Sequence, residues 1–291
     1  MRAVFNETFQ RYLSMIEEHL AQIPWGKDTL SESMSYSLVG GGKRIRPVLA
    51  LAAAEAVGGN PEKILPAAIA LELIHTYSLI HDDLPAMDND DYRRGRLSNH
   101  KVFGEANAIL AGDGLLTYAF EFLADPILGQ PEKQLRVIRE VAAAAGKNGM
   151  VGGQVLDIAG EEKKLSLTEI EEIHKAKTGA LLIASARLGG ILAGGSEEQI
   201  EALTNYAQAL GLAFQIKDDI LDVIGDSETL GKPAGSDLRQ GKSTYVSLLG
   251  LEEAKHQLHA QTQRAQSALK LFERNFSFLS ELAVYIEQRQ H

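Results

Sequence analysis

Apolar residues recur along most of this 291-residue chain at intervals of three and four, the period of an amphipathic α-helix. Near the start, Phe9, Leu13, Ile16 and Leu20 share one face of a helix predicted over residues 5–23. The same pattern predicts further helices over residues 48–57, 63–82, 106–123, 135–145, 166–188, 197–223 and from 243 onward. Because no segment shows the alternation of a strand, and no repeat is found, the pattern predicts an all-α protein.

Local signals mark where several of these helices begin and end. Pro47 suits the first turn of a helix, and Pro85 should end or kink the helix over 63–82. Ser166 and Glu169 have the spacing of a capping box. Several glycines between 149 and 160 are expected to loosen the chain there.

Composition narrows the class of protein. With 45% hydrophobic and only 6% aromatic residues, the chain can bury a large helical core, and no linker divides it, so one domain over residues 1–291 is predicted. The net charge of −10 argues against a nucleic-acid surface, and the lack of cysteine excludes disulfides and thiol catalysis. No uninterrupted apolar run reaches about 18 residues and no signal peptide is seen, so we expect a soluble, cytoplasmic protein without a transmembrane segment.

An acidic motif follows the apolar helix over 63–82. Within residues 82–91 it holds five aspartates, Asp82, Asp83, Asp88, Asp90 and Asp91, and Arg93, Arg94 and Arg96 come next. So many carboxylates repel one another unless a cation joins them, and oxygen ligands favour Mg²⁺, with the arginines suited to phosphates. Pro85 allows the chain to bulge, so that Asp88 could return to the face of Asp82. The alternative is a solvated, charged loop.

A second acidic motif lies on a predicted helix. Gln215, Asp218, Asp219 and Asp222 are spaced i, i+3, i+4 and i+7, so they share one face, where like charges destabilise a helix. A metal ion would relieve that repulsion. Two such motifs could hold several ions on opposite sides of a diphosphate.

Single basic residues extend the pattern. His75 lies two helical turns before Asp82 on the same face; the alternative is a satisfied core histidine. Lys177 stands on an apolar helix face, where it needs an anionic partner unless it reaches the surface. Asp113 and Asp157 suit structural or supporting roles.

Basic residues also stand beside glycines. Lys43 and Arg46 follow three glycines and could bind an anion near a helix start, or belong to a surface loop. Lys232 and Lys242 fall in a glycine-rich loop that suits a lid over phosphates, although loops also carry lysines for solubility.

Taken in order, these motifs resemble the trans-isoprenyl diphosphate synthases. The resemblance rests on Gly-Gly-Lys43-Arg-Ile-Arg46-Pro, His75, the run Asp82-Asp-Leu-Pro-Ala-Met-Asp88 with Arg93-Arg94-Gly, Lys177-Thr178-Gly, Gln215 with Asp218-Asp-Ile-Leu-Asp222, and Lys232. It covers nearly the whole chain. It implies the isoprenoid-synthase fold, a helical bundle around a deep central cavity, usually in a homodimer. Asn89 replaces a common aspartate at a position not expected to ligate metal.

The resemblance also implies roles for single residues. Three Mg²⁺ ions would be bound by Asp82, Asp88 and Asp218 and supported through hydrogen bonds by Asp83, Asp219 and Asp222. Isopentenyl diphosphate would be held by Lys43, Arg46, His75 and Arg94. The allylic diphosphate would be held by Arg93, Lys177, Lys232 and Lys242, with Thr178 and Gln215 facing its carbons.

The implied reaction joins isopentenyl diphosphate to dimethylallyl or geranyl diphosphate, with farnesyl diphosphate (fifteen carbons) as the expected product. Tyr77, five residues before Asp82, would form the floor of the chain cavity beside Ser78; a helical wheel does not place Tyr77 there, and an ordinary core tyrosine is the alternative. A twenty-carbon product is the alternative activity.

Three rival functions remain. A terpene cyclase of the same fold would not need the second diphosphate site that Lys43, Arg46 and His75 indicate. A metal phosphohydrolase, suggested by His81-Asp82, would need further metal-binding histidines, and the other seven form no evident set. A regulatory subunit would have lost its acidic motifs, and both are intact.

Overall fold

The computed structural model describes residues 2–161, 163–224, 242–272 and 276–290. Helices make up most of these ranges, as the hydrophobic pattern predicts. They are α1 (Arg2–Ala21), α2 (Thr29–Leu38), α3 (Ile45–Ala56), α4 (Leu65–Asp82), α5 (Asn99–Phe103), α6 (Glu105–Leu123), α7 (Pro131–Ala145), α8 (Met150–Gly160), α9 (Leu167–His174), α10 (Ala180–Leu192), α11 (Glu197–Ile224), α14 (Tyr245–Leu249), α15 (Leu251–Ala268) and α16 (Ser277–Gln288).

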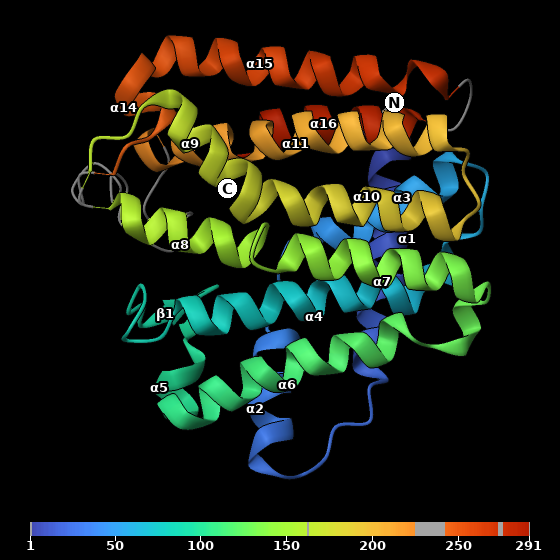
Figure 1. Ribbon diagram of the computed structural model, residues 1–291, viewed down its shortest axis with the longest axis vertical. Helices are drawn as coiled ribbons and strands as arrows, with labels where there is room; N and C mark the ends of the chain where they lie inside the picture. Colours follow the sequence, from blue (N-terminus) through green and yellow to red (C-terminus); the bar gives the residue numbers. More distant parts are fainter. Residues whose placement is uncertain (1, 162, 225–241, 273–275, 291) are drawn as a thin grey trace.

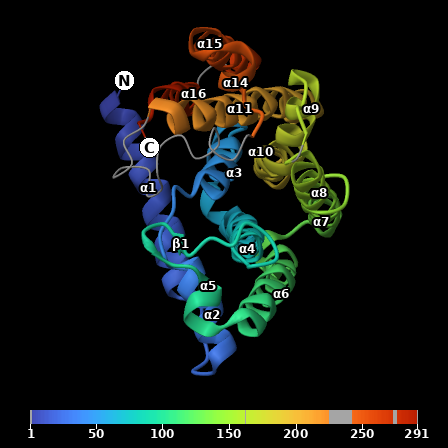
Figure 2. The same ribbon diagram turned by 90° about the vertical axis from the view of Figure 1, so that its left-hand side faces the viewer.

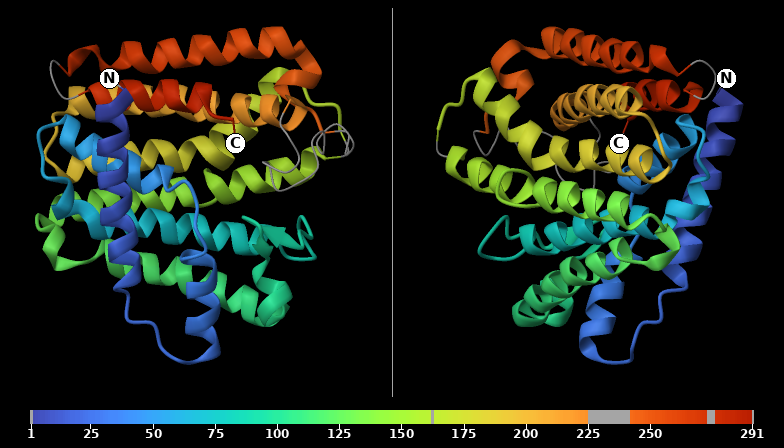
Figure 3. Two further views of the ribbon diagram at one scale, coloured as in Figure 1. Left: turned by 180° about the vertical axis from the view of Figure 1, so that it is seen from behind. Right: turned by 45° about the vertical axis from the view of Figure 1, so that its right-hand side comes forward.

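The long helices run side by side as a bundle. Figure 1 shows α15, α11, α10, α8, α4 and α6 stacked from top to bottom with their axes roughly parallel. Helix α1 crosses behind this stack, as the view from behind in Figure 3 shows. In Figure 2, α3 and α4 lie between α1 on one side and α7 and α8 on the other. The all-α prediction is therefore confirmed, while the assignment of residues 1–291 to one domain stays a prediction.

Helix α4 is the centre of the hydrophobic core. Twelve of its residues are buried, among them Ile69, Leu71, Leu73 and Ile74 with no exposed surface. By length and composition alone the stretch Pro61–Asp82 could cross a membrane, but 72% of that window is buried inside the fold. A helix that is apolar on all sides and covered by neighbouring helices is the core helix of a folded domain. Its C-terminal end carries Asp82 to the site.

Two predictions about local structure are wrong. A two-stranded antiparallel ribbon, β1 (Tyr92–Arg93) paired with β2 (Arg96–Leu97), follows the first acidic motif, where no strand is predicted. The glycines from 149 to 160 do not loosen the chain: Gly152, Gly153 and Gly160 belong to helix α8, and Gly149 is the residue immediately before it. A Cβ on Gly153 would lie 2.2 Å from the backbone nitrogen of Lys177, so a glycine is needed there for close helix packing.

The helix predicted over residues 166–188 is interrupted. Its N-terminal capping box is confirmed, since Ser166 and Glu169 each bond the other's backbone nitrogen. After α9, however, a π-helical turn, η3 (Lys175–Gly179), precedes α10. Such turns widen a helix locally and are frequent at functional sites. Here the turn carries Lys177 and Thr178.

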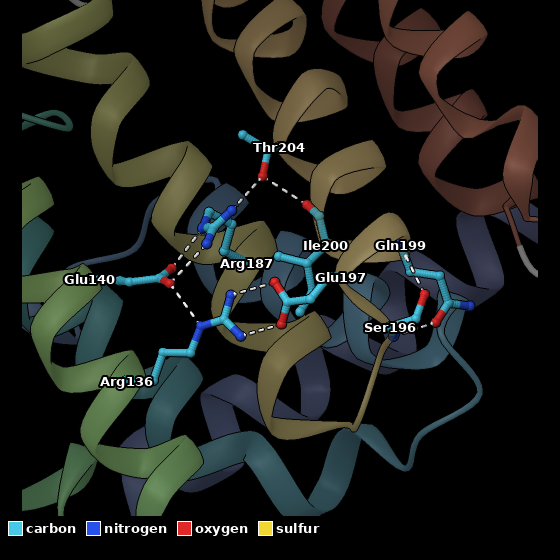
Figure 4. A network of polar contacts seen from close by, with 8 residues as sticks. All are labelled: Arg136, Glu140, Arg187, Ser196, Glu197, Gln199, Ile200 and Thr204. Carbon is cyan, nitrogen blue, oxygen red and sulfur yellow. Dashed lines mark hydrogen bonds and ion pairs between the residues drawn. The ribbon is translucent and has the colours of Figure 1, made fainter.

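Away from the site, a polar network fixes α7 against α10 and α11 (Figure 4). Nε and Nη2 of Arg187 donate to the two carboxylate oxygens of Glu140, and Nη1 donates to the hydroxyl of Thr204 at 2.9 Å. Arg136 links Glu140 to Glu197. The network links three helices. Most of its side chains are at least a quarter exposed to solvent, so each ion pair contributes modestly to stability.

Candidate active site

The two acidic motifs face one cavity. Asp82 and Asp88, from the end of α4, line it together with Asp218, Asp219 and Asp222 of α11. We call this space, of about 650 Å³, the polar cavity. Helices α4 and α11 are far apart in sequence, and the bundle brings their acidic faces to a common space. This is the arrangement that two separate acidic motifs predict.

The first motif bulges where Pro85 predicts it. Helix α4 ends at Asp82, and the backbone nitrogen of Asp88 then donates to the carbonyl of Asp82 at 2.9 Å. Asp88 therefore returns beside Asp82. Burial raises the pKa of Asp82 to about 6; the charge of Lys177 opposes this shift, and repulsion from Asp88 adds to it. A carboxylate in that state favours a bound cation.

Asp83 does not line the polar cavity but is buried in an ion pair with the half-exposed Arg93. It is 2% exposed and accepts from Nε of Arg93 at 2.9 Å. Arg93 also reaches Asp90, although it lines the polar cavity as well. Asp83 thus holds Arg93 at the cavity rim.

The second motif follows the expected helical face. Asp219 and Asp222 are 7% and 6% exposed, and Asp219 accepts from the backbone nitrogen of Tyr245 at 2.8 Å, the first residue of α14. Asp218, which is more exposed, bonds Nη2 of Arg289 at 2.6 Å. Arg289 also stacks on Phe214, with 4.2 Å from its Cζ to the ring centre. In this structure a guanidinium therefore neutralises Asp218.

Lys177, Thr178 and Gln215 meet on the wall of the polar cavity. Nζ of Lys177 bonds Oδ2 of Asp157 at 2.6 Å, which is the anionic partner the apolar position requires. Burial lowers the pKa of Lys177, but Asp157 and the acidic motif outweigh it, so the net shift is upward and the amine stays charged. The hydroxyl of Thr178 donates to Oε1 of Gln215 at 2.5 Å.

Arg46, His75 and Arg94 gather around a buried carboxylate, Glu72. Arg94 lies 4.0 Å from Glu72, and the charges of both arginines act on His75. Burial lowers the pKa of His75 well below its usual value and the arginines lower it further, so His75 is neutral at pH 7. Nε of Arg46 is buried and has no hydrogen-bond partner among the described residues. An N–H donor without a partner in a cluster of positive charges can bind a phosphate oxygen.

Lys43 lies apart from these three residues. It lines the polar cavity, where burial and then Arg289 lower its pKa to about 8 while Asp218 opposes the shift. Of the four residues predicted to hold isopentenyl diphosphate, Lys43 therefore lines the polar cavity and the other three do not. Of the two loop lysines, Lys242 lines the polar cavity and Lys232 lies outside the described residues.

A second, apolar cavity adjoins the first. This apolar cavity, of about 550 Å³, is lined by Arg46, His75, Tyr77 and Ser78 at one wall and by apolar side chains of α6 and α8. Asp82, Lys177 and Thr178 line both cavities. Tyr77 is 6% exposed and packs edge-on against the ring of His81, 5.8 Å between centres. A hydrocarbon attached to a diphosphate in the polar cavity could extend here.

The carboxylates fit a metal ion whose coordination shell is completed by the substrate. No three Asp, Glu or His side chains in the described part of the chain are close enough to hold an ion unaided. Mg²⁺, however, is usually held by one or two carboxylates plus substrate phosphates and waters. The raised pKa of Asp82 and the return of Asp88 beside it are what such a site needs before the cation arrives.

The comparisons with known proteins agree with this geometry. The Polyprenyl synthetase family model matches residues 27–276. The chain belongs to the polyprenyl synthetase family. It is 51% identical to the farnesyl diphosphate synthase of Micrococcus luteus over 96% of both chains, and 47% identical to that of Geobacillus stearothermophilus over 98% and 97%. The predicted resemblance is therefore confirmed.

Solved structures of the family share the fold. A farnesyl/geranylfarnesyl diphosphate synthase from Zymomonas mobilis superposes with a TM-score of 0.88 at 37% identity, covering 99% of this chain and all of the other. A geranylgeranyl diphosphate synthetase from Pyrococcus horikoshii gives the same TM-score at 35% identity, covering 98% and 99%. Similar folds thus belong to enzymes whose named products differ in length.

Four residues at or behind this polyprenyl synthetase site are not predicted from the sequence: Gln154 and Arg289 at the site, and the buried Arg44 and Glu72 behind it. Glu72 offered a signal, because a glutamate within an all-apolar helix needs a buried partner. Gln154 lines the apolar cavity with both amide atoms buried and no partner among the described residues. Arg289 offered no signal, since nothing in its local sequence connects it to Asp218.

Proposed function

We propose that this chain is a prenyltransferase that condenses isopentenyl diphosphate with dimethylallyl and then geranyl diphosphate to give farnesyl diphosphate. One observation carries the proposal: two acidic motifs face a polar cavity that opens into an apolar cavity. A diphosphate suits the first space and a growing isoprenoid chain suits the second. The names of the family members support the same reaction.

Two diphosphates need two basic sites, and the basic residues fall into two groups. Lys177, Arg93 and Lys242 line the polar cavity beside the aspartates and suit the allylic diphosphate. Arg46, His75 and Arg94 form the second group and suit isopentenyl diphosphate. We assign Lys43 to the second substrate as well, although it lines the polar cavity, and Lys232 to the first.

Metal dependence is part of the proposal. Asp82, Asp88 and Asp218 would hold Mg²⁺, expected as three ions with substrate bound, while Asp83, Asp219 and Asp222 support through hydrogen bonds. When bound, the ions would neutralise the charge that develops on the departing diphosphate. Arg289 bonds Oδ1 of Asp218 in this structure, so a cation at Asp218 would bind through the other carboxylate oxygen or in place of that ion pair.

The chain's own residues then guide the reaction. The allylic C–O bond breaks with its electron pair passing to the diphosphate, whose charge Lys177 and Arg93 stabilise. The double bond of isopentenyl diphosphate forms the new C–C bond with the allylic cation. A proton leaves the isopentenyl unit, and the released diphosphate accepts it. The oxygens of Thr178 and Gln215 face the cation, and the apolar wall excludes water.

The position of Tyr77 supports a fifteen-carbon product. Tyr77 is buried on the wall of the apolar cavity, next to Ser78 and five residues before Asp82 on α4, where it could limit chain growth. Family members that make geranylgeranyl diphosphate are 47% to 49% identical to this chain, so a twenty-carbon product is the alternative.

The rival functions fit the structure less well. A terpene cyclase uses one diphosphate and leaves the group around Arg46 and Arg94 without a ligand. A phosphohydrolase using His81 is disfavoured, because Nε2 of His81 bonds the carbonyl of Ile109 at 3.0 Å and points away from the aspartates' cavity. An inactive regulatory subunit does not need both acidic motifs.

We further propose a cytoplasmic homodimer. Large apolar side chains are exposed on α6 and α8, including Leu110 at 55% and Leu156 at 48%. Side chains of this kind are covered when subunits associate. Light scattering of the purified chain tests the dimer, and a mass of one subunit at micromolar concentration contradicts it.

Product analysis tests the proposed function. The chain is incubated with Mg²⁺, labelled isopentenyl diphosphate and, in turn, dimethylallyl, geranyl or farnesyl diphosphate, and the dephosphorylated products are separated by chromatography. We expect farnesol from the first two primers and little elongation of the third. Labelled geranylgeraniol as the main product favours the alternative, and a cyclic or unlabelled product contradicts prenyl transfer.

A further inference from the structure

Arg44 is the most heavily bonded residue of the glycine-rich loop before α3. Its side chain has no exposed surface and makes three contacts from three directions: Nε to Glu17 of α1 at 2.7 Å, Nη1 to Glu72 of α4 at 2.7 Å, and Nη2 to the carbonyl of Leu38 at 2.8 Å. One guanidinium thus joins α1, the end of α2 and α4. A planar fork with five donors can do this, and a lysine cannot.

The backbone at Arg44 is held in an unfavourable conformation. Its φ of 49° and ψ of 30° lie in the left-handed region, which side-chain-bearing residues seldom adopt. Arg44 is also the residue immediately before α3, so this conformation sets the direction in which the helix starts. Lys43 on one side of it reaches the polar cavity, and Arg46 on the other reaches the apolar cavity. Such a conformation persists only where surrounding contacts impose it.

Glu72 connects this loop to the hairpin that follows α4. It is 1% exposed, bonds Arg44, and lies 4.0 Å from Nη2 of Arg94 in the β1–β2 turn. Arg94 in turn donates to the carbonyl of Gly41 and packs so closely on Gly42 that a Cβ there would lie 2.6 Å from its Cζ. The loop and the hairpin therefore interlock, and Glu72 touches both.

We propose that the buried pair Arg44–Glu72 is a positioning device that aims Arg46 and Arg94 at isopentenyl diphosphate. Neither member of the pair can touch the substrate, since their side chains are 0% and 1% exposed. The inference rests on the proposed function, because it takes the ligand of Arg46 and Arg94 to be that diphosphate. It adds a role for two residues that line neither cavity.

A charge-neutral double variant tests the role. Arg44→Met with Glu72→Leu removes one positive and one negative charge, so the net charge near Arg46 and Arg94 is unchanged. Apolar replacements of a buried ion pair are often neutral or stabilising, so the fold should survive. We expect KM for isopentenyl diphosphate to rise by about tenfold or more, with KM for geranyl diphosphate and kcat at saturation changed by less than about threefold.

A matched pair elsewhere serves as the control. Arg187→Met with Glu140→Leu removes the bidentate pair of Figure 4, at the same zero net change of charge. It should shift the melting temperature and leave both KM values unchanged. A purely structural role for Arg44–Glu72 predicts that its double variant behaves like this control. A folded double variant with KM for isopentenyl diphosphate within twofold of the wild type would therefore overturn the proposal.

A second variant and a binding measurement complete the test. If the double variant does not fold, Arg44→Lys is used instead, because it keeps the charge but cannot make all three contacts. An unchanged KM for isopentenyl diphosphate in that variant then overturns the proposal.

Calorimetric titration with isopentenyl diphosphate alone separates the positioning role of Arg44–Glu72 from the proposed reaction. If the wild type binds it but forms no product, the proposed reaction fails, and the pair is still tested by the change in Kd. If the wild type does not bind it, both fail.

Discussion

At the scale of single residues, the site is defined by which charges have partners. Lys177 has Asp157, and Asp218 has Arg289, whereas Nε of Arg46 has no partner among the described residues. Burying a charged group without a partner is unfavourable, so the open donor of Arg46 is one that substrate would fill. The two basic groups should therefore respond to different substrates.

Separate replacement of the two groups checks this assignment. Arg46→Met should raise KM mainly for isopentenyl diphosphate, and Lys177→Met mainly for geranyl diphosphate, each by roughly tenfold to a hundredfold, because each loses a charge-assisted bond. Methionine keeps the aliphatic packing of both side chains. Steady-state kinetics with each substrate varied in turn measure the effect. Equal increases for both substrates in both variants would contradict separate sites.

The length of the product should depend on Tyr77. Tyr77→Ala removes a buried ring from the wall of the apolar cavity, so the deeper space should admit a twenty-carbon chain. A bulky side chain in Ser78→Phe should narrow the cavity and favour ten carbons. Chromatography of products made with excess isopentenyl diphosphate shows the distribution. Release of only fifteen-carbon product by Tyr77→Ala would show that another residue sets the length.

At the scale of elements, the turn between α9 and α10 links the site to the C-terminal helices. His174, at the end of α9, stacks on Tyr245 of α14, 5.9 Å between ring centres and 19° between planes. Its Nδ1 is buried without a partner among the described residues. Burial lowers the pKa of His174 to about 4, while Asp157 opposes that shift and Lys177 adds to it.

This histidine should make the fold sensitive to acid. The unfolded chain takes up a proton at His174 near its ordinary pKa of about 6.5, and the folded chain does so only near 4. Stability is thus lost as the pH falls through that window, by about 2 kcal/mol between roughly pH 7 and pH 5. His174→Phe keeps the stacking on Tyr245. Between pH 7 and pH 5, its free energy of unfolding, measured in urea, should therefore fall by about 2 kcal/mol less than that of the wild type. The raised pKa of Asp82 has the opposite effect, because it adds stability as the pH falls. Asp82 is present in both proteins, so the contribution of His174 is read from the difference between their two pH profiles. An identical pH dependence of the two would refute this role.

Much of the helical architecture follows from the hydrophobic period, and the exceptions have physical causes. The boundaries of α6 and α11 lie within a few residues of the predicted ones, because their apolar stripes and caps are local properties. The π-helical turn at Lys175–Gly179 and the helicity of α8 depend on close packing between Gly153 and Lys177, which no local pattern contains. The β1–β2 ribbon is too short to show alternation.

For the site, sequence spacing predicts the acidic faces but not their neighbours. Asp218 and Asp222 share a helix face by periodicity alone, and Pro85 signals the bulge that returns Asp88 to Asp82. The partnership of Asp218 with Arg289 joins residues 71 positions apart and requires the complete fold. The same is true of Glu72 and Arg44.

At the scale of the whole molecule, the fold brings two acidic helix ends together over one cavity. Helix α4 is buried along its length and α11 packs against α15 and α10, so neither end is free to move independently of the core. The chain can therefore keep carboxylates close together before any cation binds. The central claim is that both motifs act on one metal-dependent site.

The rate of farnesyl diphosphate formation from labelled isopentenyl and geranyl diphosphates tests this claim most directly. We compare the wild type with Asp82→Ala, Asp218→Ala and a control, Asp113→Ala, whose aspartate is on α6 in a separate groove beside Trp25. With Mg²⁺ present, the wild type and the control should be active, and each of the other variants should lose at least about a hundredfold in turnover while circular dichroism remains unchanged. With EDTA, the wild type should lose its activity too. Turnover near that of the wild type in either motif variant, or in EDTA, would contradict the account.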